Sequence, residues 1–259
     1  MVLSDVDIIK NLGERIGIYP FCEDNVKGAS YNLTASKFAW RDDELVHPTE
    51  DNKIILEPSS TTLVMTEEAV WVDSSLAGTY HSKVRLVSKG LGHISTTLDP
   101  NWVGPSLISV HNYSEDAYHL SVGASFVTLI FDNLLTPSTK ASTNTPGRAG
   151  LVREHSDEFE EWLEDRNEKE KILTKLKGSS TYKDAKQKIT SPWKEFYKQF
   201  WFWLIMWLVA WLLILGGPLC VDSFKKLHPN LNYICEHAPT FLVGVPALLA
   251  LFRIEQRRS

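Results

Sequence analysis

The longest apolar run of the chain extends from Gln199 to Val221 and contains no ionisable side chain. A helix of that length crosses a hydrocarbon core of roughly 30 Å, so the run predicts a transmembrane helix. A second uncharged run, Ala238–Phe252, predicts the return half of a two-helix transmembrane hairpin over residues 199–252. It reaches spanning length only if residues 232–237 also enter the bilayer. Because Pro246 would kink it, a re-entrant or interfacial segment stays open as the alternative.

Shorter apolar runs separated by turn residues fill the first half of the chain. Residues 1–17 place apolar side chains at helical spacing, which predicts a helix capped by Ser4 or Asp5. Residues 18–46 mix aromatic and β-branched residues with turn residues and predict short strands. From residue 53 to residue 133, strand-like runs alternate with turn motifs such as EPSS and DPNWVGP. This spacing is typical of an all-β barrel or sandwich.

Three polar segments lie between the strand region and the apolar run. Residues 136–153 are rich in Ser, Thr, Pro and Gly and predict a linker. Residues 154–178 predict one amphipathic helix of about six turns, capped by Ser156, which either packs on its own domain or serves self-association or coupling to the membrane. Residues 179–198 predict a juxtamembrane connector. The lysines expected to form an interfacial anchor there are Lys183, Lys186, Lys188 and Lys194.

Charge orients the predicted spans and limits the partners. The formal net charge of −5 gives no support for a broad nucleic-acid-binding face. The N-terminus carries no signal-peptide pattern, and Lys and Arg flank both spans, including the basic tail 253–259, so both termini are expected in the cytoplasm. The loop between the spans would face an oxidising compartment. There, Cys220 and Cys235 either form a disulfide or remain free thiols.

Three stretches of the strand region carry a family resemblance: GASYNL at its start, the run from LEPSS to SVHN in its middle, and VGASFVTLIFDNL at its end. The most specific piece is the motif LDPxWxG, which begins at Leu98 and is followed by a strand that ends in Asn112. Over residues 10–135 the chain resembles the dCTP deaminase/dUTPase family. The resemblance implies a nucleotide-binding domain over residues 1–135 with a mainly β fold. In that family a distorted β-barrel, or jelly roll, trimerises and binds pyrimidine nucleotides at subunit boundaries.

The catalytic residues of the family are only partly matched. The deaminases carry a general-base glutamate on the strand after the turn, and the matching position here is Ser109. A serine alone does not take a proton from water near neutral pH. The dUTPases place a water-orienting aspartate in the turn, which Asp99 matches. Their serine–arginine motif corresponds to a differently spaced stretch, residues 82–90, a glycine-rich arm is missing, and Asn32 replaces an aspartate often found in the first motif.

The resemblance and the charges define a candidate ligand site made of Asn32, Lys83, Arg85, Ser88, Asp99 and Trp102. Lys83, Arg85 and Lys89 would share one strand face and either contact phosphates or form a solvated face. Asp99 either orients a water molecule, with Mg²⁺ if the protein is a hydrolase, or hydrogen-bonds within its own turn. Trp102 either stacks on a base or plugs the end of the barrel. The dispersed histidines predict no metal site and no resident cofactor.

Trp203, Trp207 and Trp211 recur every four residues in the first predicted span and form one stripe. The stripe either faces lipid and neighbouring helices, or lines a hydrophobic constriction that gates by dewetting. No ionisable residue lies in this span, which argues against a transporter with a charged midplane site. Two helices cannot enclose a pore alone, so a homo-oligomer, a trimer or higher, is expected in the lipid bilayer.

A nucleotide-binding domain joined to a membrane hairpin is similar to the architecture of bacterial antiphage effectors. That likeness implies an inner-membrane effector whose cytosolic domain senses a nucleotide or oligonucleotide, made by a partner nucleotidyltransferase, and controls a homo-oligomeric pore. One alternative is a membrane-tethered dCTP deaminase/dUTPase-type hydrolase that uses Asp99. A further alternative is a scaffold that binds no ligand.

Overall fold

The structure is a computed structural model that describes residues 1–92, 96–140, 145–152, 155–189, 199–207 and 209. Contacts divide the chain into two units, residues 1–193 and residues 194–259. The elements of the first unit are α1 (Asp5–Asn11), β1 (Ile16–Tyr19), η1 (Glu23–Asn25), β2 (Val26–Lys27), β3 (Ser30–Arg41), β4 (Glu44–Val46), β5 (Lys53–Leu56), β6 (Thr61–Val72), β7 (Leu76–Ser82), α2 (Val84–Val87), β8 (Leu91–Gly92), β9 (Thr97–Leu98), β10 (Val103–Asn112), β11 (Tyr118–Ser121), β12 (Ser125–Asn133), η2 (Pro146–Leu151), α3 (Asp157–Glu164) and α4 (Lys169–Gly178).

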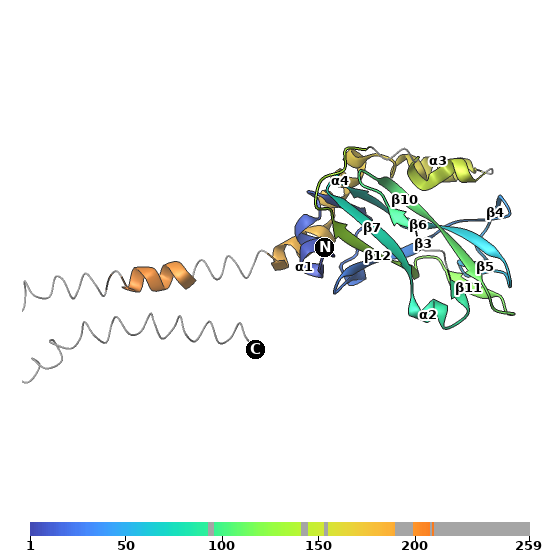
Figure 1. Cartoon of the computed structure of the whole chain (residues 1–259), viewed down its shortest axis with the longest axis horizontal. Coiled ribbons are helices and arrows are strands. Elements are labelled where there is room, and N and C mark those ends of the chain that lie inside the picture. The colour runs from blue at the N-terminus through green and yellow to red at the C-terminus, as the bar shows by residue number, and fades with distance from the viewer. Residues whose placement is uncertain (93–95, 141–144, 153–154, 190–198, 208, 210–259) are drawn as a thin grey trace, which may run out of the picture. The chain divides into compact units, whose positions relative to one another are not determined.

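An antiparallel sheet forms the body of the first unit (Figure 1). Its strands follow the order β8-β10-β6-β3-β12-β7-β9, with β1 paired to β6 and with β2 and β4 paired to β3, while β5 and β11 form a separate pair. β9 lies at one end of this order and β10 lies next to the other, yet only residues 99–102 connect them. The sheet must therefore curl until its ends approach each other. The mainly β fold expected from the sequence is confirmed, and it takes the form of a curled antiparallel sheet.

The long strands β3 and β6 carry much of the core. β3 pairs with β12 through its first part and with β6 through its second, with an irregular register between Ala35 and Ala39. Just before this irregularity, the backbone N–H of Thr34 donates to Glu68 Oε2 at 2.8 Å, and the Thr34 hydroxyl donates to Glu68 Oε1 at 3.1 Å. Glu68 is only 2% exposed, so the sheet encloses a carboxyl group.

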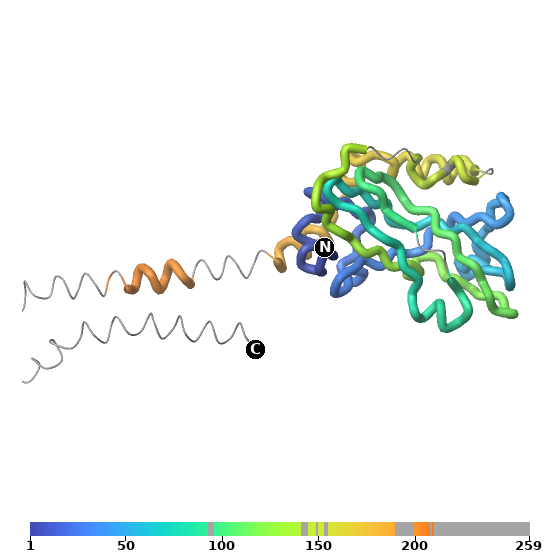
Figure 2. Tube along the Cα trace, viewed as in Figure 1, coloured from blue at the N-terminus to red at the C-terminus, as the bar shows by residue number. Residues whose placement is uncertain are grey.

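The N-terminal helix forms as predicted, with Ser4 as its cap. Ser4 and Asp7 form a reciprocal capping box. Gly13 follows the helix with a φ of 80°, and a Cβ at this position would lie 2.6 Å from the hydroxyl oxygen of Tyr182. Tyr182 belongs to a helix over residues 180–189, which runs beside α1 (Figure 2). Glycine is required here both by the backbone conformation and by this close approach.

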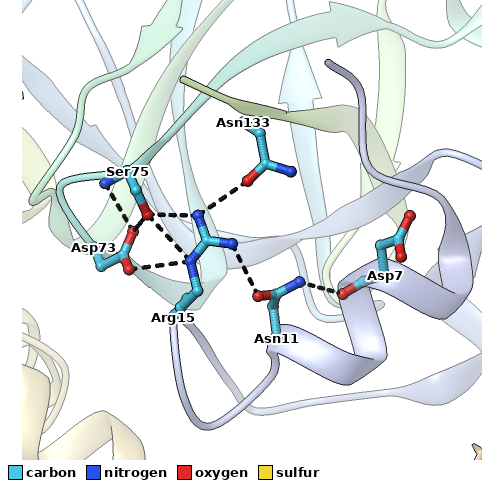
Figure 3. A network of polar contacts seen from close by, with 6 residues as sticks. All are labelled: Asp7, Asn11, Arg15, Asp73, Ser75 and Asn133. Carbon is cyan, nitrogen blue, oxygen red and sulfur yellow. Dashed lines mark hydrogen bonds and ion pairs between the residues drawn. The ribbon is translucent and has the colours of Figure 1, made fainter. Parts of the chain in front are cut away.

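Arg15 ties three separate segments together (Figure 3). Its Nε donates to Asp73 Oδ2 at 3.2 Å, and its Nη2 donates to Ser75 Oγ at 2.5 Å. The same guanidinium group donates to the side-chain oxygens of Asn11 at the end of α1 and of Asn133 at the end of β12. All of these contacts lie inside the fold and fix its N-terminal end, so Arg15 has a structural role.

The helix predicted over residues 154–178 is wrong in one respect, because two helices, α3 and α4, occupy it. Residues 165–168 separate them. Ser156 caps α3 as expected, and its hydroxyl accepts a hydrogen bond from the Phe159 backbone N–H at 3.1 Å. A polar stretch separates the apolar positions of this segment, and the helix is interrupted within that stretch.

Both helices pack on the sheet, which confirms the first of the two interpretations of this segment. Phe159 of α3 is fully buried, with its ring centroid 5.2 Å from that of Phe38 and 5.0 Å from that of Trp40. Ile172 of α4 is also fully buried and packs beside Trp71. The helices are therefore part of the folded domain, which extends beyond the predicted boundary at residue 135.

The predicted juxtamembrane connector begins as the helix over residues 180–189. Lys186 pairs with Glu14 at 3.5 Å, and Lys188 pairs with Glu23 at 2.8 Å. Two of the four lysines of the predicted interfacial anchor therefore contact carboxylates of their own domain.

The predicted membrane region is only partly described. No helix in the described part of the chain is long and apolar enough to span a membrane. In the second unit, residues 199–207 are helical and contain Trp203 and Trp207. The predicted features that lie outside the described residues are Lys194, Trp211, the Cys220–Cys235 pair, the return span 238–252 and the tail 253–259.

Candidate ligand site

A cavity of about 290 Å³ lies where the two ends of the curled sheet approach each other. β7 contributes Tyr80 to its lining, β9 contributes Thr97, and β10 contributes a run from Ser106 to Ser109. The segment η2, whose backbone is kinked at Gly147 and Arg148, contributes Arg148 and Leu151. The cavity thus joins strands of the family domain to the segment that follows it.

The turn between β9 and β10 holds Trp102 in the cavity wall. The Trp102 backbone N–H donates to the Asp99 carbonyl at 3.2 Å, and its indole Nε1 donates to the Gly104 carbonyl at 3.0 Å. Gly104 has a φ of 123°, and a Cβ there would lie 2.8 Å from Pro146 Cβ, so glycine is required. Trp102 is 4% exposed and lines the cavity, so it is both a packed core residue and part of the cavity wall.

A buried pair of hydroxyl groups forms another part of the wall. Tyr80 Oη and Ser106 Oγ lie 2.5 Å apart, and the Ser106 backbone N–H donates to Thr66 Oγ1 at 2.8 Å. Burial raises the pKa of Tyr80, the charge of Asp99 raises it further, and the charge of Arg148 lowers it. The phenol is therefore neutral near pH 7, and both charged groups lie close enough to act on it.

Ser109 lies on β10, half-buried, and lines the cavity. The sequence resemblance predicts that this position matches the general-base glutamate of the deaminases. Among the described residues that line the cavity, none carries a carboxylate or an imidazole. The lining offers hydroxyl groups, an indole and a guanidinium group, which bind a ligand but do not remove a proton from water.

The basic stretch after β7 is helical, which makes the predicted strand face of Lys83, Arg85 and Lys89 wrong. The Val87 backbone N–H donates to the Lys83 carbonyl at 3.0 Å and closes the helical turn of α2. Leu86 is buried and anchors this turn on the domain. The prediction depended on the alternation of side chains between the two faces of a strand. Side chains of a helical turn do not alternate in this way, so the spacing of the three residues no longer places them on one face.

Lys83 turns towards the domain, and its Nζ donates to Ser125 Oγ at 2.5 Å. Burial lowers the pKa of Lys83, and the charges of Arg85 and Lys27 lower it further. Arg85 and Ser88 are exposed on α2, where the Ser88 hydroxyl donates to the Arg85 carbonyl at 3.2 Å. None of the predicted residues on this segment lines the 290 Å³ cavity.

Of the two predicted residues not yet described, Asn32 makes a contact within the sheet and Asp99 lies next to the cavity. Asn32 is 8% exposed on β3 and accepts a hydrogen bond from the Thr128 hydroxyl at 2.9 Å. Asp99 is half-buried in the turn that borders the cavity, and the Thr97 hydroxyl donates to its Oδ1 at 3.4 Å. Of the six predicted residues, Trp102 lines the cavity and Asp99 borders it, while the other four lie elsewhere on this chain.

Sequence reasoning missed Tyr80, Ser106 and Arg148. Their local sequence carries no signal, because the curling of the sheet and the packing of η2 bring them together. The segment predicted as a linker, residues 136–153, in fact contains η2, which packs against β10. Within the described part of the chain, no three His, Cys, Asp or Glu side chains cluster in a way that could hold a metal ion.

Comparison with known proteins shows which family this domain is similar to. The family model described as dCTP deaminase-like matches residues 2–134. The dCTP deaminase of Pyrococcus horikoshii is 28% identical over 153 residues, which cover 59% of this chain and 96% of that protein. A deoxyuridine 5'-triphosphate nucleotidohydrolase of Hydrogenovibrio crunogenus is 31% identical over 91 residues, 34% of this chain and 60% of that protein. The crystal structure of the 2'-deoxycytidine 5'-triphosphate deaminase from Agrobacterium tumefaciens aligns with a TM-score of 0.44 and 14% identity, covering 50% of this chain and 48% of that one.

Proposed function

We propose that this chain, which belongs to the dCTP deaminase-like family, binds a nucleotide or oligonucleotide without converting it and uses the bound state to control a membrane pore. The observation that carries the proposal is Ser109. It lines the cavity, and the sequence resemblance matches it to the deaminases' general base. The lining described above offers no carboxylate or imidazole in its place. A site that keeps its cavity without its base serves binding.

The helix over residues 199–207 supports the membrane half of the proposal. Most of the large apolar side chains from Phe200 to Val209 are at least 42% exposed, whereas Leu204 is half-buried. A helix that is apolar all round belongs in a protein core or in lipid. We infer a homo-oligomer, a trimer or higher, in a bacterial inner membrane with both termini in the cytoplasm. Its role would be antiphage defence, with a signal made by a partner nucleotidyltransferase.

Native mass spectrometry of the detergent-purified full chain tests this function, followed by extraction of whatever small molecules co-purify. We expect an oligomer that carries a nucleotide or oligonucleotide, and we expect no release of ammonia from dCTP or of pyrophosphate from dUTP. Turnover of either nucleotide would show that the protein is an enzyme and would contradict the proposal.

A membrane-tethered hydrolase is the second candidate, because Asp99 borders the cavity and its charge acts on Tyr80. If Asp99 orients the attacking water, Asp99→Asn abolishes Mg²⁺-dependent dUTP hydrolysis while the unfolding temperature stays unchanged. Asp116→Asn, at an exposed turn aspartate outside the cavity lining, is the matched control and should retain full activity. Hydrolysis retained in the Asp99 variant would exclude this role.

A further inference from the structure

Arg148 lies in a short segment that the fold holds firmly against the cavity. Its backbone adopts a left-handed conformation with a φ of 47°, directly after Gly147 with a φ of 64°. Pro146 packs so closely on Gly104 that no Cβ fits between them, and Leu163 of α3 lies against Gly147 from another direction. A non-glycine residue held at positive φ is uncommon and marks a position worth a functional explanation.

The guanidinium group of Arg148 lies beside an aromatic ring and forms no ion pair with the described residues. Its Cζ lies 5.8 Å from the ring centroid of Trp102, and the residue is half-buried. Among the described residues, the Arg148 side chain makes no hydrogen bond and no ion pair, although a guanidinium group offers five N–H donors in a planar fork. A half-buried cation with unused donors at the wall of a cavity is complementary to an oxyanion.

We propose that Arg148 binds a phosphate group of the ligand in this cavity. The class of ligand rests on the function proposed above, whereas the charge complementarity rests on Arg148 alone. The cavity, at about 290 Å³, has the size of a small-ligand pocket, so it takes one nucleotide unit. The hydroxyl groups of Thr97 and Ser109 lie in the same lining and are available to the polar edges of that unit.

This phosphate contact comes from outside the family domain, since the family model ends at residue 134. Arg148 belongs to η2, and the chain continues from there to α3 and α4. A ligand that engages Arg148 therefore contacts both the barrel and the segment that leads towards the second unit.

Isothermal titration of the full chain in detergent, with dCTP and with deoxycytidine as probes, tests the assignment. Arg148→Ala should weaken dCTP binding by about 10- to 100-fold, the range for hydrogen bonds to a charged group, and leave deoxycytidine binding unchanged. Arg148→Lys should recover part of the loss, because lysine keeps the charge but loses the fork. Arg41→Ala removes another half-buried arginine, one that does not line the cavity, and should bind dCTP as the wild type does.

The outcomes separate this proposal from the one before it. If Arg148→Ala binds dCTP as tightly as the wild type, the assignment of Arg148 fails while nucleotide binding stands. If the wild type binds neither probe, the assignment of Arg148 to a phosphate of a single nucleotide fails, whereas the nucleotide-sensing function is decided by the ligand that co-purifies in native mass spectrometry. Unfolding temperatures of the Arg148 variants close to that of the wild type would show that the loss of binding does not come from misfolding.

Discussion

The carboxyl group of Glu68 is buried inside the sheet, so its ionisation affects the stability of the fold. Both its carboxyl oxygens accept hydrogen bonds from Thr34, which favour the ionised form. Burial outweighs them and raises the pKa of Glu68 from its ordinary 4.5 to about 7. The unfolded chain therefore releases this proton near pH 4.5, whereas the folded chain holds it to about pH 7. Because the folded state binds more protons in this window, the free energy of unfolding falls as the pH rises through it.

Glu68→Gln should remove this pH dependence, because an amide resembles the neutral acid. In urea unfolding at about pH 8, we expect the variant to be more stable than the wild type by up to about 3 kcal/mol, and near pH 4.5 we expect the two to unfold alike. Glu50→Gln, at an exposed glutamate, should follow the wild type at both pH values. A variant that keeps the wild-type pH dependence would show that Glu68 is ionised in the folded protein.

α3 depends on one aromatic side chain for its attachment to the sheet. Phe159 is fully buried between Phe38 and Trp40, whereas Glu161 on the same helix is exposed. Phe159→Ala should therefore cost about 3 to 5 kcal/mol if α3 unfolds with the domain. Amide hydrogen exchange should show lost protection over residues 157–164, and Glu161→Ala should retain it. Unchanged protection in the Phe159 variant would mean that the remaining contacts of α3 suffice.

The elements differ in how well their sequence predicts them. The N-terminal helix was predictable, because the Ser4 cap and the apolar spacing of residues 1–17 are local signals. α2 was not, because Val84 and Val87 favour a strand and only the burial of Leu86 and the closing hydrogen bonds select a helical turn. The polar gap between α3 and α4 was visible in the sequence, but the gap alone did not predict that the helix ends there and a second helix begins.

The candidate site was predictable only where its residues are consecutive. Asp99 and Trp102 belong to one turn, so the motif LDPxWxG identified them together. Tyr80 and Arg148 reach the same cavity through the curling of the sheet and the packing of η2, which are tertiary effects without a local pattern. Lys83, Arg85 and Ser88 were grouped with the turn by charge, although α2 places them away from the cavity of their own chain.

At the scale of the whole chain, the two units differ in the exposure of their apolar side chains. The first unit encloses its core within the curled sheet and under α1, α3 and α4. The described part of the second unit is a helix with mostly exposed apolar side chains, among them Trp203 at 59% and Ile205 at 54%. Exposure of such a continuous apolar surface in water is unfavourable by roughly 25 cal/mol for each Å². Under the function proposed above, a lipid bilayer or other copies of the chain would cover this helix.

Truncation tests whether the second unit attaches the chain to a membrane. The full chain, expressed in bacteria, should sediment with membranes and stay there after an alkaline carbonate wash, because buried apolar helices are not released by breaking ionic contacts. A chain of residues 1–193 retains the whole first unit and should remain in the soluble fraction, with cooperative unfolding. If the full chain were released by carbonate, its attachment would be electrostatic. If residues 1–193 also sedimented with the membrane, the first unit would carry a membrane-binding surface of its own, and the apolar segment would not be the anchor.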